Sequence, residues 1–392
     1  MREETDRSIV LTGATGFLGA FLMANLLERG YHVTVLGRAS KDMELSDRLS
    51  ALVRWFNIAA PAESLRALET DFSKRHLGLD DETYKLLCGA AGKIIHCASD
   101  TSFAERNREQ VMTANVNNLA VLLDLAADAR AGHMYYVSTA YVAGKCEGLC
   151  MEKPVTMDSF TNVYEESKAR AEVIISQYCR NHGIPLSILR PSIVYGHSKT
   201  GLSMKFNALY YPVKSVSYVR DIYLKDILYQ GGKQSRRWNI SMGDDDILCL
   251  PMEFYFPNNG FVNLIPVDYF VESTLRIVEH PESEGIYHLT SENPPDMATL
   301  TEYTERFLGV RGIQILSDPA LRTHEPNPVE ELLNRYIEPY RPYLSDMRIF
   351  DRSRINNITV GLVDPTFTYE IFERCMAYAV ACDWGRKSPL LT

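Results

Sequence analysis

Short apolar runs alternate with longer amphipathic stretches through the first half of the chain. Residues 8–11 form an apolar run before a glycine-rich turn, and apolar residues recur at helical spacing over 17–29. The segments 93–98 and 134–137 read as further strands, and a helical stretch follows over 164–182. This alternation predicts an α/β fold in which a doubly wound parallel sheet is covered by helices on both faces.

The pattern stops near residue 196 and resumes over 261–290. We therefore expect a Rossmann-type nucleotide-binding domain formed by 1–196 plus 261–290, and a smaller substrate-binding lobe formed by 197–260 plus 291–392. A chain of 392 residues with 46% hydrophobic content is longer than one ordinary domain, which agrees with this division.

The turn after the first predicted strand is rich in glycine. It reads Gly-Ala-Thr-Gly-Phe-Leu-Gly, and it lies between a strand and a helix. A pyrophosphate can approach bare backbone at such a point and accept hydrogen bonds from the free N–H groups of the helix N-terminus. A simple tight turn is the alternative, which the flanking strand and helix make less favourable. We expect dinucleotide contacts at Gly13, Thr15, Gly16, Phe17, Leu18 and Gly19.

The second predicted strand, over 31–36, ends in Gly37 and Arg38. An NAD-binding unit places an acidic residue here, against the 2′-hydroxyl of the ribose. A guanidinium instead suits a 2′-phosphate by its charge and its fork of donors, so Arg38 favours NADP(H) over NAD(H). A solvated surface arginine is the alternative interpretation.

Two other strand ends offer cofactor contacts. Asp71 and Phe72 follow a further predicted strand, where a carboxylate can accept a hydrogen bond from the adenine amino group. The small residues Cys97, Ala98 and Ser99 end the strand over 93–98, where a cofactor could pass close to the backbone. Ordinary strand-end structure explains each of these features equally well.

Tyr164 and Lys168 are four residues apart, so their side chains share one face of the predicted helix. A free phenol has a pKa near 10 and is a poor acid at neutral pH. A cation about 4 Å away, at an effective dielectric near 20, is worth roughly 4 kcal/mol, or about three pKa units. We therefore expect Lys168, helped by an oxidised nicotinamide, to lower the pKa of Tyr164 into the range where proton transfer is efficient.

Composition and charge exclude several classes of protein. A net charge of −9 provides no strongly basic face, so we expect no nucleic-acid partner. No run of eighteen apolar residues occurs, and Met1 to Arg7 contain no signal-peptide core, so we expect a cytoplasmic protein without a membrane segment. The eight cysteines are irregularly spaced, as in proteins with reduced thiols. Cys146 and Cys150 lack a second pair nearby, and we expect no metal site.

The segment 199–237 departs from the overall acidity. It holds eight basic and two acidic residues, a net charge of +6, together with five tyrosines, and Trp238 follows it. A solvated helix face with aromatic side chains packed inward is the plain interpretation of this composition.

Four motifs together resemble an extended short-chain dehydrogenase/reductase. They are the glycine-rich turn over 13–19, Ser138-Thr139 at a strand end, the Tyr164 and Lys168 pair, and Leu-Arg-Pro-Ser-Ile-Val-Tyr-Gly over 189–196. The similarity covers about residues 8 to 290. The segments 95–98, 137–142 and 263–269 resemble, more narrowly, the branch that holds fatty acyl-CoA reductases and the thioester reductase domains of carboxylic acid reductases and peptide synthetases.

The resemblance implies a role for individual residues. Thr139 would hydrogen-bond the substrate carbonyl, Tyr164 would donate the proton, and Lys168 would hold the nicotinamide ribose. The backbone at Pro191 and Ile193 would border the nicotinamide, and Asn115 would lie on a helix behind the active site. We also expect substrate contacts at Ser138 and Tyr141, which neighbour Thr139 in the sequence.

The activity that the resemblance implies is NADPH-dependent reduction of an acyl thioester to an aldehyde, with a further reduction to the alcohol left open. The thioester would be carried by coenzyme A or an acyl carrier protein, whose phosphates or acidic surface would meet Arg236 and Arg237 at the mouth of the acyl pocket. One alternative is an extended reductase or epimerase that acts on an aldehyde, ketone or nucleotide sugar. The other is a nucleotide-sensing or scaffold protein without catalysis, although such proteins commonly lose the tyrosine or the lysine.

Overall fold

The computed structural model describes residues 7–387 except 41, 147, 158 and 257–259. The prediction that the chain has no signal-peptide core rests on residues 1–7. Residues 1–6 of that segment lie outside the described part of the chain. The chain divides into two compact units. Unit 1 consists of residues 1–194, 267–290 and 348–364, and unit 2 consists of residues 195–266, 291–347 and 365–392.

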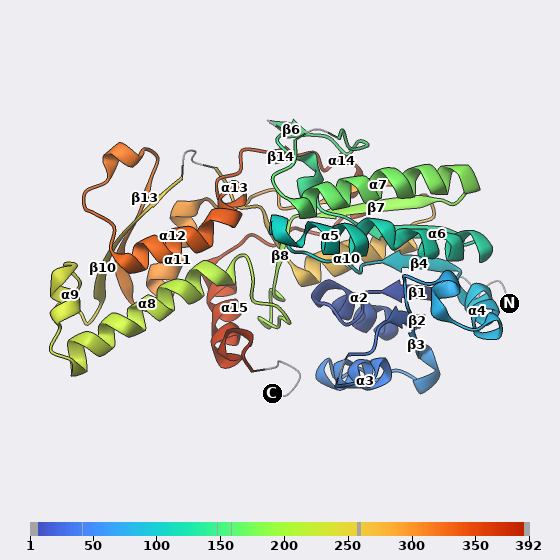
Figure 1. Cartoon of the computed structure of the whole chain (residues 1–392), viewed down its shortest axis with the longest axis horizontal. Coiled ribbons are helices and arrows are strands. Elements are labelled where there is room, and N and C mark those ends of the chain that lie inside the picture. The colour runs from blue at the N-terminus through green and yellow to red at the C-terminus, as the bar shows by residue number, and fades with distance from the viewer. Residues whose placement is uncertain (1–6, 41, 147, 158, 257–259, 388–392) are drawn as a thin grey trace. The chain divides into compact units, whose positions relative to one another are not determined.

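Unit 1 is built on a parallel sheet of seven strands in the order β12-β7-β5-β4-β1-β2-β3 (Figure 1). Neighbouring strands are paired in parallel throughout this sheet. The predicted α/β parallel sheet is confirmed. The strands are β1 (Ser8–Thr12), β2 (His32–Gly37), β3 (Leu65–Glu69), β4 (Lys93–His96), β5 (His133–Val137), β7 (Leu186–Pro191) and β12 (Gly285–Leu289).

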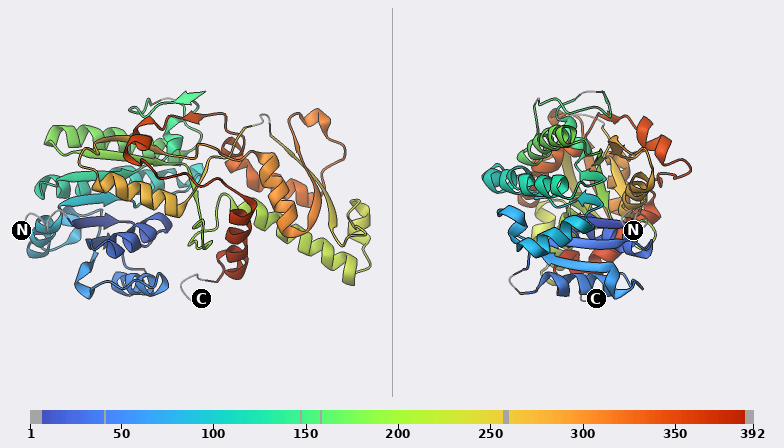
Figure 2. Two further views of the ribbon diagram at one scale, coloured as in Figure 1. Left: turned by 180° about the vertical axis from the view of Figure 1, so that it is seen from behind. Right: turned by 90° about the vertical axis from the view of Figure 1, so that its right-hand side faces the viewer.

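Helices cover both faces of this sheet, because its central strands are apolar on both sides (Figure 2). On one face, apolar side chains of α4, α6 and α7 pack with Val10, Ile94 and Met134 of the strands in one buried cluster. On the other face α2 packs against α10. The helices of unit 1 are α2 (Phe17–Glu28), α3 (Leu45–Trp55), α4 (Asp81–Ala90), α5 (Arg108–Met112), α6 (Leu119–Asp128), α7 (Val163–His182), α10 (Val267–Glu279) and α14 (Ser353–Ile358).

Helix α7 begins and ends where its sequence provides capping residues. The side chain of Asn162 accepts a hydrogen bond from the backbone N–H of Glu165, which satisfies one free donor of the first turn. Gly183 ends the helix in the left-handed conformation at φ 65°, as glycine commonly does. The predicted helix from Tyr164 to His182 is therefore confirmed, and it starts one residue earlier.

The segment 348–364 packs with unit 1, whereas the sequence pattern assigned all of 291–392 to the lobe. Strand β14 (Ile349–Phe350) pairs in parallel with β6 (Leu149–Cys150), and the carboxylate of Glu152 accepts hydrogen bonds from the backbone N–H groups of His288 and Arg354. These contacts join residues far apart in sequence, so no local pattern predicts them. Residues 195–196 and 261–266 likewise belong to unit 2.

Unit 2 combines a small sheet with helices. Strand β10 (Leu248–Tyr255) pairs in parallel with β13 (Val310–Leu316) and antiparallel with β9 (Ser241–Met242). Aromatic side chains of α11 (Met297–Leu308) and α15 (Tyr369–Ala381) pack together, with the Tyr303 and Phe372 ring centroids 5.7 Å apart. The other elements are α8 (Tyr210–Tyr229), α9 (Lys233–Arg237), β11 (Leu264–Pro266), α12 (Pro328–Ile337) and α13 (Arg341–Leu344), and β8 (Ile193–Tyr195) lies at the boundary between the units.

Candidate active site

The strand order of unit 1 creates a crossover point between β1 and β4. From β1 the chain adds β2 and β3 on one side, and it then returns to add β4, β5, β7 and β12 on the other. Ligands of open α/β sheets bind outside the carboxyl ends of the strands at such a point. Gly13 follows β1 and Cys97 follows β4 at this place, so the predicted dinucleotide turn lies at the crossover.

The glycine-rich turn forms a cradle that has no room for side chains. Gly13 has φ +79°, and a Cβ placed there would lie 2.6 Å from the backbone nitrogen of Ala98. A Cβ on Gly19 would overlap the carbonyl group of Gly13. The N–H of Gly16 donates to the carbonyl of Gly13 at 2.9 Å, and α2 begins at the next residue. The cradle and the helix N-terminus behind it fit a pyrophosphate group.

The strand ends on either side of the crossover are joined by Thr12 and His96. The Thr12 hydroxyl lies 2.7 Å from Nδ1 of His96 and accepts a hydrogen bond from the N–H of Ala98 at 3.2 Å. Burial, helped by the charge of Lys168, lowers the pKa of His96 to about 3, so the ring is neutral. The neutral His96 ring thus joins two strand ends through its contact with Thr12. Thr12 was missed, although a polar residue closing a buried strand is a signal that could have found it.

Tyr164 and Lys168 project from α7 toward the carboxyl end of β5. The Lys168 Nζ atom donates to the backbone carbonyl of Val137 at 2.8 Å and lies 4.8 Å from the centre of the Tyr136 ring. Thr139 lies close enough to Tyr164 to lower the pKa of its phenol. The structure therefore brings together the three residues predicted to perform the chemistry.

Desolvation is the largest influence on the pKa values of both Tyr164 and Lys168. Burial raises the pKa of Tyr164 above its ordinary value, and Cys97 and Glu165 raise it further, while Thr139 opposes the shift. Desolvation therefore outweighs the local stabilisation of the phenolate in this structure. The expectation that Lys168 and an oxidised nicotinamide together lower the pKa of Tyr164 stays a prediction. Burial also lowers the pKa of Lys168 to about 8, against the raising effects of Cys97 and Glu172.

Two buried serine hydroxyls flank Thr139 and Pro191. The Oγ atoms of Ser138 and Ser192 are inaccessible to solvent and have no hydrogen-bond partner among the described residues. Thr139 Oγ1 donates to the carbonyl of Pro191 at 3.4 Å and accepts from the N–H of Tyr141 at 3.3 Å. Buried hydroxyls without partners are costly, so these two reduce the stability of the strand ends.

Asn115 is the centre of a hydrogen-bond network behind Tyr164. It is buried in the π-helical turn Thr113–Asn117, and its Nδ2 atom donates to the Ser167 hydroxyl at 2.9 Å and to the carbonyl of Asp100 at 2.8 Å. Its Oδ1 atom accepts from the N–H of Asp100 at 2.7 Å and from the Ser99 hydroxyl at 3.2 Å. Asn115 thus holds the loop after β4, and π-helical turns of this kind are frequent at functional sites.

That loop carries Phe103, which the sequence did not single out. The Phe103 ring lies 5.9 Å from the Tyr164 ring, centre to centre, at an interplanar angle of 32°. An aromatic residue in a polar loop shortly after a strand end was the available signal. Phe103 covers part of the Tyr164 ring and contributes to the burial that raises its pKa.

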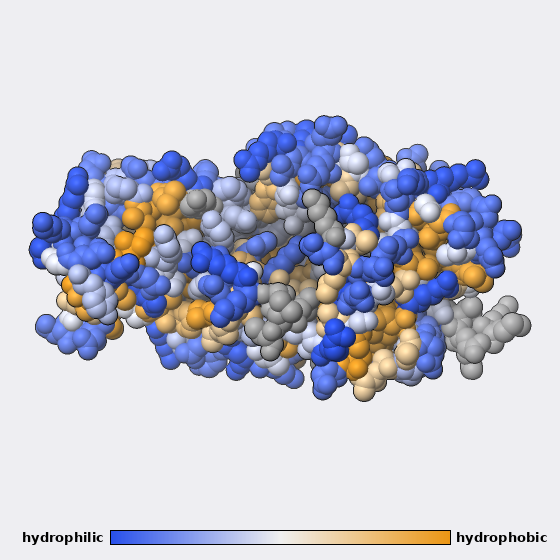
Figure 3. Space-filling view, turned by 60° about the horizontal axis from the view of Figure 1, so that its bottom comes forward, coloured by the Kyte–Doolittle hydropathy of each residue, from blue (hydrophilic) through white to orange (hydrophobic). Residues whose placement is uncertain are grey.

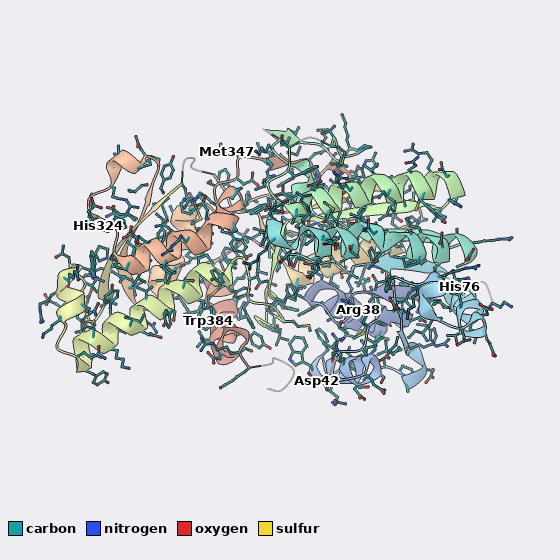
Figure 4. All side chains as sticks on the ribbon, in the orientation of Figure 1. Arg38, Asp42, His76, His324, Met347 and Trp384 are labelled. Carbon is teal, nitrogen blue, oxygen red and sulfur yellow. The ribbon has the colours of Figure 1, made fainter. Side chains whose placement is uncertain are left out.

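The residues predicted to contact the adenosine half lie at the ends of β2 and β3. Arg38 directly follows β2 and its side chain is exposed (Figure 4). The carboxylate of Asp71 accepts from the Ser73 hydroxyl at 2.6 Å, and hydrogen bonds with Ser73 and Lys74 lower its pKa to about 2. Phe72 packs against the buried cluster under α4 and α6. A permanent carboxylate in this position keeps its capacity to accept hydrogen bonds.

The residues predicted to contact substrate lie in both units. The Tyr141 ring is buried 6.0 Å from the Phe350 ring, with the Arg348 guanidinium 4.9 Å from its centre. Ile193, which was predicted to border the nicotinamide and not the substrate, is half-buried in β8. Arg236 and Arg237 are exposed in α9 of unit 2, where Arg236 donates to the carbonyl of Gly231 and Arg237 lies over Trp238. Their proposed place at the mouth of an acyl pocket stays a prediction.

In residues 7–387, apart from the gaps, no three His, Cys, Asp or Glu side chains are grouped as a metal ion would require. No helix within the same residues has the length and apolar character needed to cross a bilayer.

Comparison with known proteins identifies the family. The sequence profile of the family described as male sterility protein matches residues 11–274, more than half of the chain, and the chain belongs to this family. It is 31% identical over 208 residues to the non-canonical nonribosomal peptide synthetase cpsA of Aspergillus campestris, a match covering 49% of this chain and 20% of that protein. The isonitrile lipopeptide synthase of Streptomyces coeruleorubidus is 29% identical over 205 residues, covering 50% of this chain and 14% of that protein. The chain thus matches a fifth or less of the length of these relatives.

Solved structures share the fold over nearly the whole chain. The terminal R domain from the myxalamid PKS-NRPS biosynthetic pathway has a TM-score of 0.74 and 22% identity, covering 97% of this chain and 92% of its own. A thiolation-reductase di-domain from an archaeal nonribosomal peptide synthetase has a TM-score of 0.69 and 15% identity, covering 96% and 75%. A UDP-glucuronic acid 4-epimerase from Bacillus cereus has a TM-score of 0.63 and 14% identity, covering 95% and 99%. The resemblance to extended short-chain dehydrogenase/reductases found in the sequence is confirmed.

Proposed function

We propose that this protein is an NADPH-dependent reductase that releases an aldehyde from a carrier-bound acyl thioester. One observation carries this proposal: Thr139, Tyr164 and Lys168 are assembled at the sheet edge that also carries the glycine cradle. The relatives named as peptide synthetases and the R-domain structures support the same reaction class.

The chain offers a complete set of contacts for a nicotinamide dinucleotide. Gly13, Gly16 and the first turn of α2 would receive the pyrophosphate. Arg38 at the end of β2 would pair with a 2′-phosphate, because its guanidinium is exposed and can form two parallel hydrogen bonds. The preference for NADPH over NADH rests on this residue.

When bound, a reduced nicotinamide supplies a hydride to the thioester carbonyl. The Thr139 hydroxyl donates a hydrogen bond to the carbonyl oxygen as negative charge develops there, and Tyr164 gives that oxygen its proton. A raised pKa suits this role, because Tyr164 stays protonated throughout the physiological range. The tetrahedral product then collapses, the carbon–sulfur bond breaks, and the carrier leaves as a thiol. One thioester, one hydride and one proton thus give one aldehyde and one thiol.

Lys168 prepares Tyr164 for the next turnover. Its ammonium group is fixed by the Val137 carbonyl, and with a pKa of about 8 it is mostly charged at neutral pH. The positive charge would stabilise the phenolate left after proton transfer. The ammonium also has hydrogen-bond donors left for the ribose hydroxyls.

Unit 2 offers a surface for an acidic carrier on α8 and α9. Figure 3 shows one face of the molecule, on which hydrophobic residues lie among hydrophilic ones. Tyr218, Leu228 and Tyr229 are 64%, 61% and 80% exposed there, beside exposed cations. The two acidic residues of the segment are engaged locally, since Asp221 pairs with Arg220 and Asp226 accepts from Ser235. The cations therefore dominate the outer surface, as an acidic partner requires. They are Lys225, Lys233, Arg236 and Arg237.

Charge reversal tests this carrier surface. Arg236→Glu with Arg237→Glu should raise KM for a carrier-bound thioester about tenfold and leave kcat and the turnover of a free aldehyde unchanged. Lys85→Glu with Arg66→Glu is the matched control, since both residues are exposed in unit 1. Equal losses with the carrier-bound and the free substrate would reject the carrier surface while leaving the reaction class intact.

A panel of substrates tests the reaction itself. NADPH consumption is measured with an acyl-CoA, an acyl group on a carrier protein, a long-chain aldehyde and a nucleotide sugar, and the products are identified by mass spectrometry. Thioester-dependent consumption with one aldehyde formed per thiol released is the expected result. Turnover of the nucleotide sugar alone would assign the chain to the epimerase-like alternative instead.

A further inference from the structure

Two thiols lie in contact on the loop that joins β5 to α7. The Sγ atoms of Cys146 and Cys150 are 2.8 Å apart, with Cys150 buried and Cys146 half-buried. The reductase mechanism uses neither of them. Two cysteines alone do not complete a zinc site, and the described residues around them supply no third ligand group.

The backbone on both sides of the pair is held in place. The N–H of Cys146 donates to the carbonyl of Ala143 at 3.2 Å, and the carbonyl of Cys150 accepts from the N–H of Asp351 at 2.9 Å. Gly148, at φ +74°, turns the chain between them. A disulfide requires a sulfur separation of about 2.05 Å, so the two thiols can join with a small movement of their side chains.

The two cysteines lie in a loop closed by a hydrogen bond, and Thr139 and Tyr164 lie a few residues before and after this loop. The N–H of Lys145 donates to the carbonyl of Ser159 at 3.1 Å, which closes the loop on itself. On one side the N–H of Gly144 donates to the carbonyl of Tyr141 at 3.0 Å, two residues from Thr139. On the other side the loop leads to Asn162, which caps the helix that carries Tyr164. A covalent link at Cys146 is thus connected to Thr139 through a short chain of backbone hydrogen bonds.

We propose that Cys146 and Cys150 form a redox modification site: a peroxide converts them to a disulfide that fixes the loop and slows turnover, and a dithiol reverses it. The Cys146 sulfur, which is the more accessible, attacks the peroxide, so that the O–O bond breaks, one water leaves and a sulfenic acid remains. The Cys150 sulfur then attacks that sulfur, the S–O bond breaks and a second water leaves. Two thiols lose two hydrogen atoms in total, and hydrogen peroxide becomes two waters.

Peptide mapping tests the modification without reference to any activity. The full chain is treated with stoichiometric hydrogen peroxide, the remaining thiols are alkylated, and the fragments are analysed by mass spectrometry. The peptide holding residues 146 and 150 should lose two hydrogen atoms and escape alkylation, whereas the half-buried Cys88 and Cys249 stay alkylated. Alkylation of both Cys146 and Cys150 after treatment, or a disulfide to any other cysteine, would overturn the proposal.

Proteolysis reads the effect on the loop independently of the reaction. Trypsin cleaves after the exposed Lys145 in the reduced protein. Oxidation should slow this cleavage at least threefold, and a dithiol should restore it. The double variant Cys146→Ser with Cys150→Ser should show no change on oxidation, while Cys88→Ser should respond like the natural chain. An unchanged cleavage rate in the oxidised natural chain would contradict the fixed loop.

The effect on turnover rests on the proposed reductase function. Oxidised protein should reduce a thioester at least threefold more slowly than reduced protein, with full recovery in a dithiol and no response in the double serine variant. A mapped disulfide with unchanged turnover would overturn the switch. If the chain reduces no thioester in either redox state, the proposed reductase function is wrong. Peptide mapping and proteolysis then test the disulfide without reference to activity.

Discussion

The side-chain amine of Lys168 is hydrogen-bonded to the last residue of strand β5: its Nζ atom donates to the backbone carbonyl of Val137 at 2.8 Å. Val137 precedes Thr139 by two residues, and Lys168 lies one helical turn after Tyr164. One hydrogen bond therefore sets the position of the helix that carries the phenol relative to the strand end that carries the threonine. The cost of burying the amine is the cause of its lowered pKa.

Activity should fall as the pH rises through about 8. Lys168 is charged below its pKa of about 8 and neutral above it, so the charge that stabilises the phenolate is present at neutral pH and lost in mild alkali. Tyr164 does not cause the fall, because its pKa lies far higher. The measurement is the pH profile of kcat/KM, which reports groups of the free enzyme. Lys168→Arg should shift the fall to higher pH, and a fall unchanged in this variant would assign it to another group.

Gly13→Ala should abolish NADPH binding. The added methyl group would meet the Ala98 backbone at 2.6 Å, and the residue has a positive φ that disfavours alanine. Gly89→Ala is the matched control, because nothing lies within 4 Å of its Cβ position in α4 and its φ is ordinary. Helix propensity predicts that this control gains about 0.5–1 kcal/mol of stability. Fluorescence titration with NADPH compares the two variants, and retained affinity in Gly13→Ala would contradict the cradle.

Arg38→Ala should weaken NADPH much more than NADH. Loss of a charge-assisted pair with the 2′-phosphate is worth roughly 1.5–3 kcal/mol, or a factor of about ten to a hundred in Kd. Arg66→Ala removes the same charge from the exposed side of β3 and should leave both affinities unchanged. Titration of both variants with both dinucleotides checks this, and a proportional loss for NADPH and NADH would show that Arg38 does not read the phosphate.

Glu152→Gln should reduce the dependence of stability on pH. Burial raises the pKa of Glu152 to about 7 from 4.5, although the N–H groups of His288 and Arg354 partly offset the shift. A raised carboxyl pKa contributes stability that is complete below the unfolded value of 4.5 and is lost as the pH rises through about 7. The contribution is on the order of 2–3 kcal/mol. Denaturant unfolding at pH 5 and pH 8 should show a smaller difference for the variant than for the natural chain.

Local sequence predicted the parallel sheet of unit 1 and the helix that carries Tyr164, although strand β7 was not singled out. The strands are short apolar runs that end in glycine or small polar residues, and α7 is bounded by Asn162 and Gly183, whose capping chemistry is visible in the sequence. Segment 348–364 was misassigned because it is held by pairing of β14 with β6 and by the side chain of Glu152. Such contacts join residues about two hundred positions apart and leave no periodic pattern.

The sequence indicated which residues form the candidate site. It did not indicate how burial would shift their pKa values. The spacing on one helix face indicated Tyr164 and Lys168, and the resemblance to extended short-chain dehydrogenase/reductases implied Thr139. The sign of the shift in the Tyr164 pKa depends on burial, to which Phe103 contributes from another loop. The hydrogen bond between Lys168 and Val137 has a backbone carbonyl as its acceptor. Only the fold determines which backbone carbonyl lies near a given side chain.

The most direct test of the central claim is the turnover of Tyr164→Phe with a carrier-bound thioester and NADPH. Loss of the proton donor should lower kcat about 10²–10⁴-fold while the Kd for NADPH changes less than twofold, since the phenyl ring keeps its packing against Phe103. Retention of at least half of the natural kcat, with the aldehyde still formed, would show that another group supplies the proton.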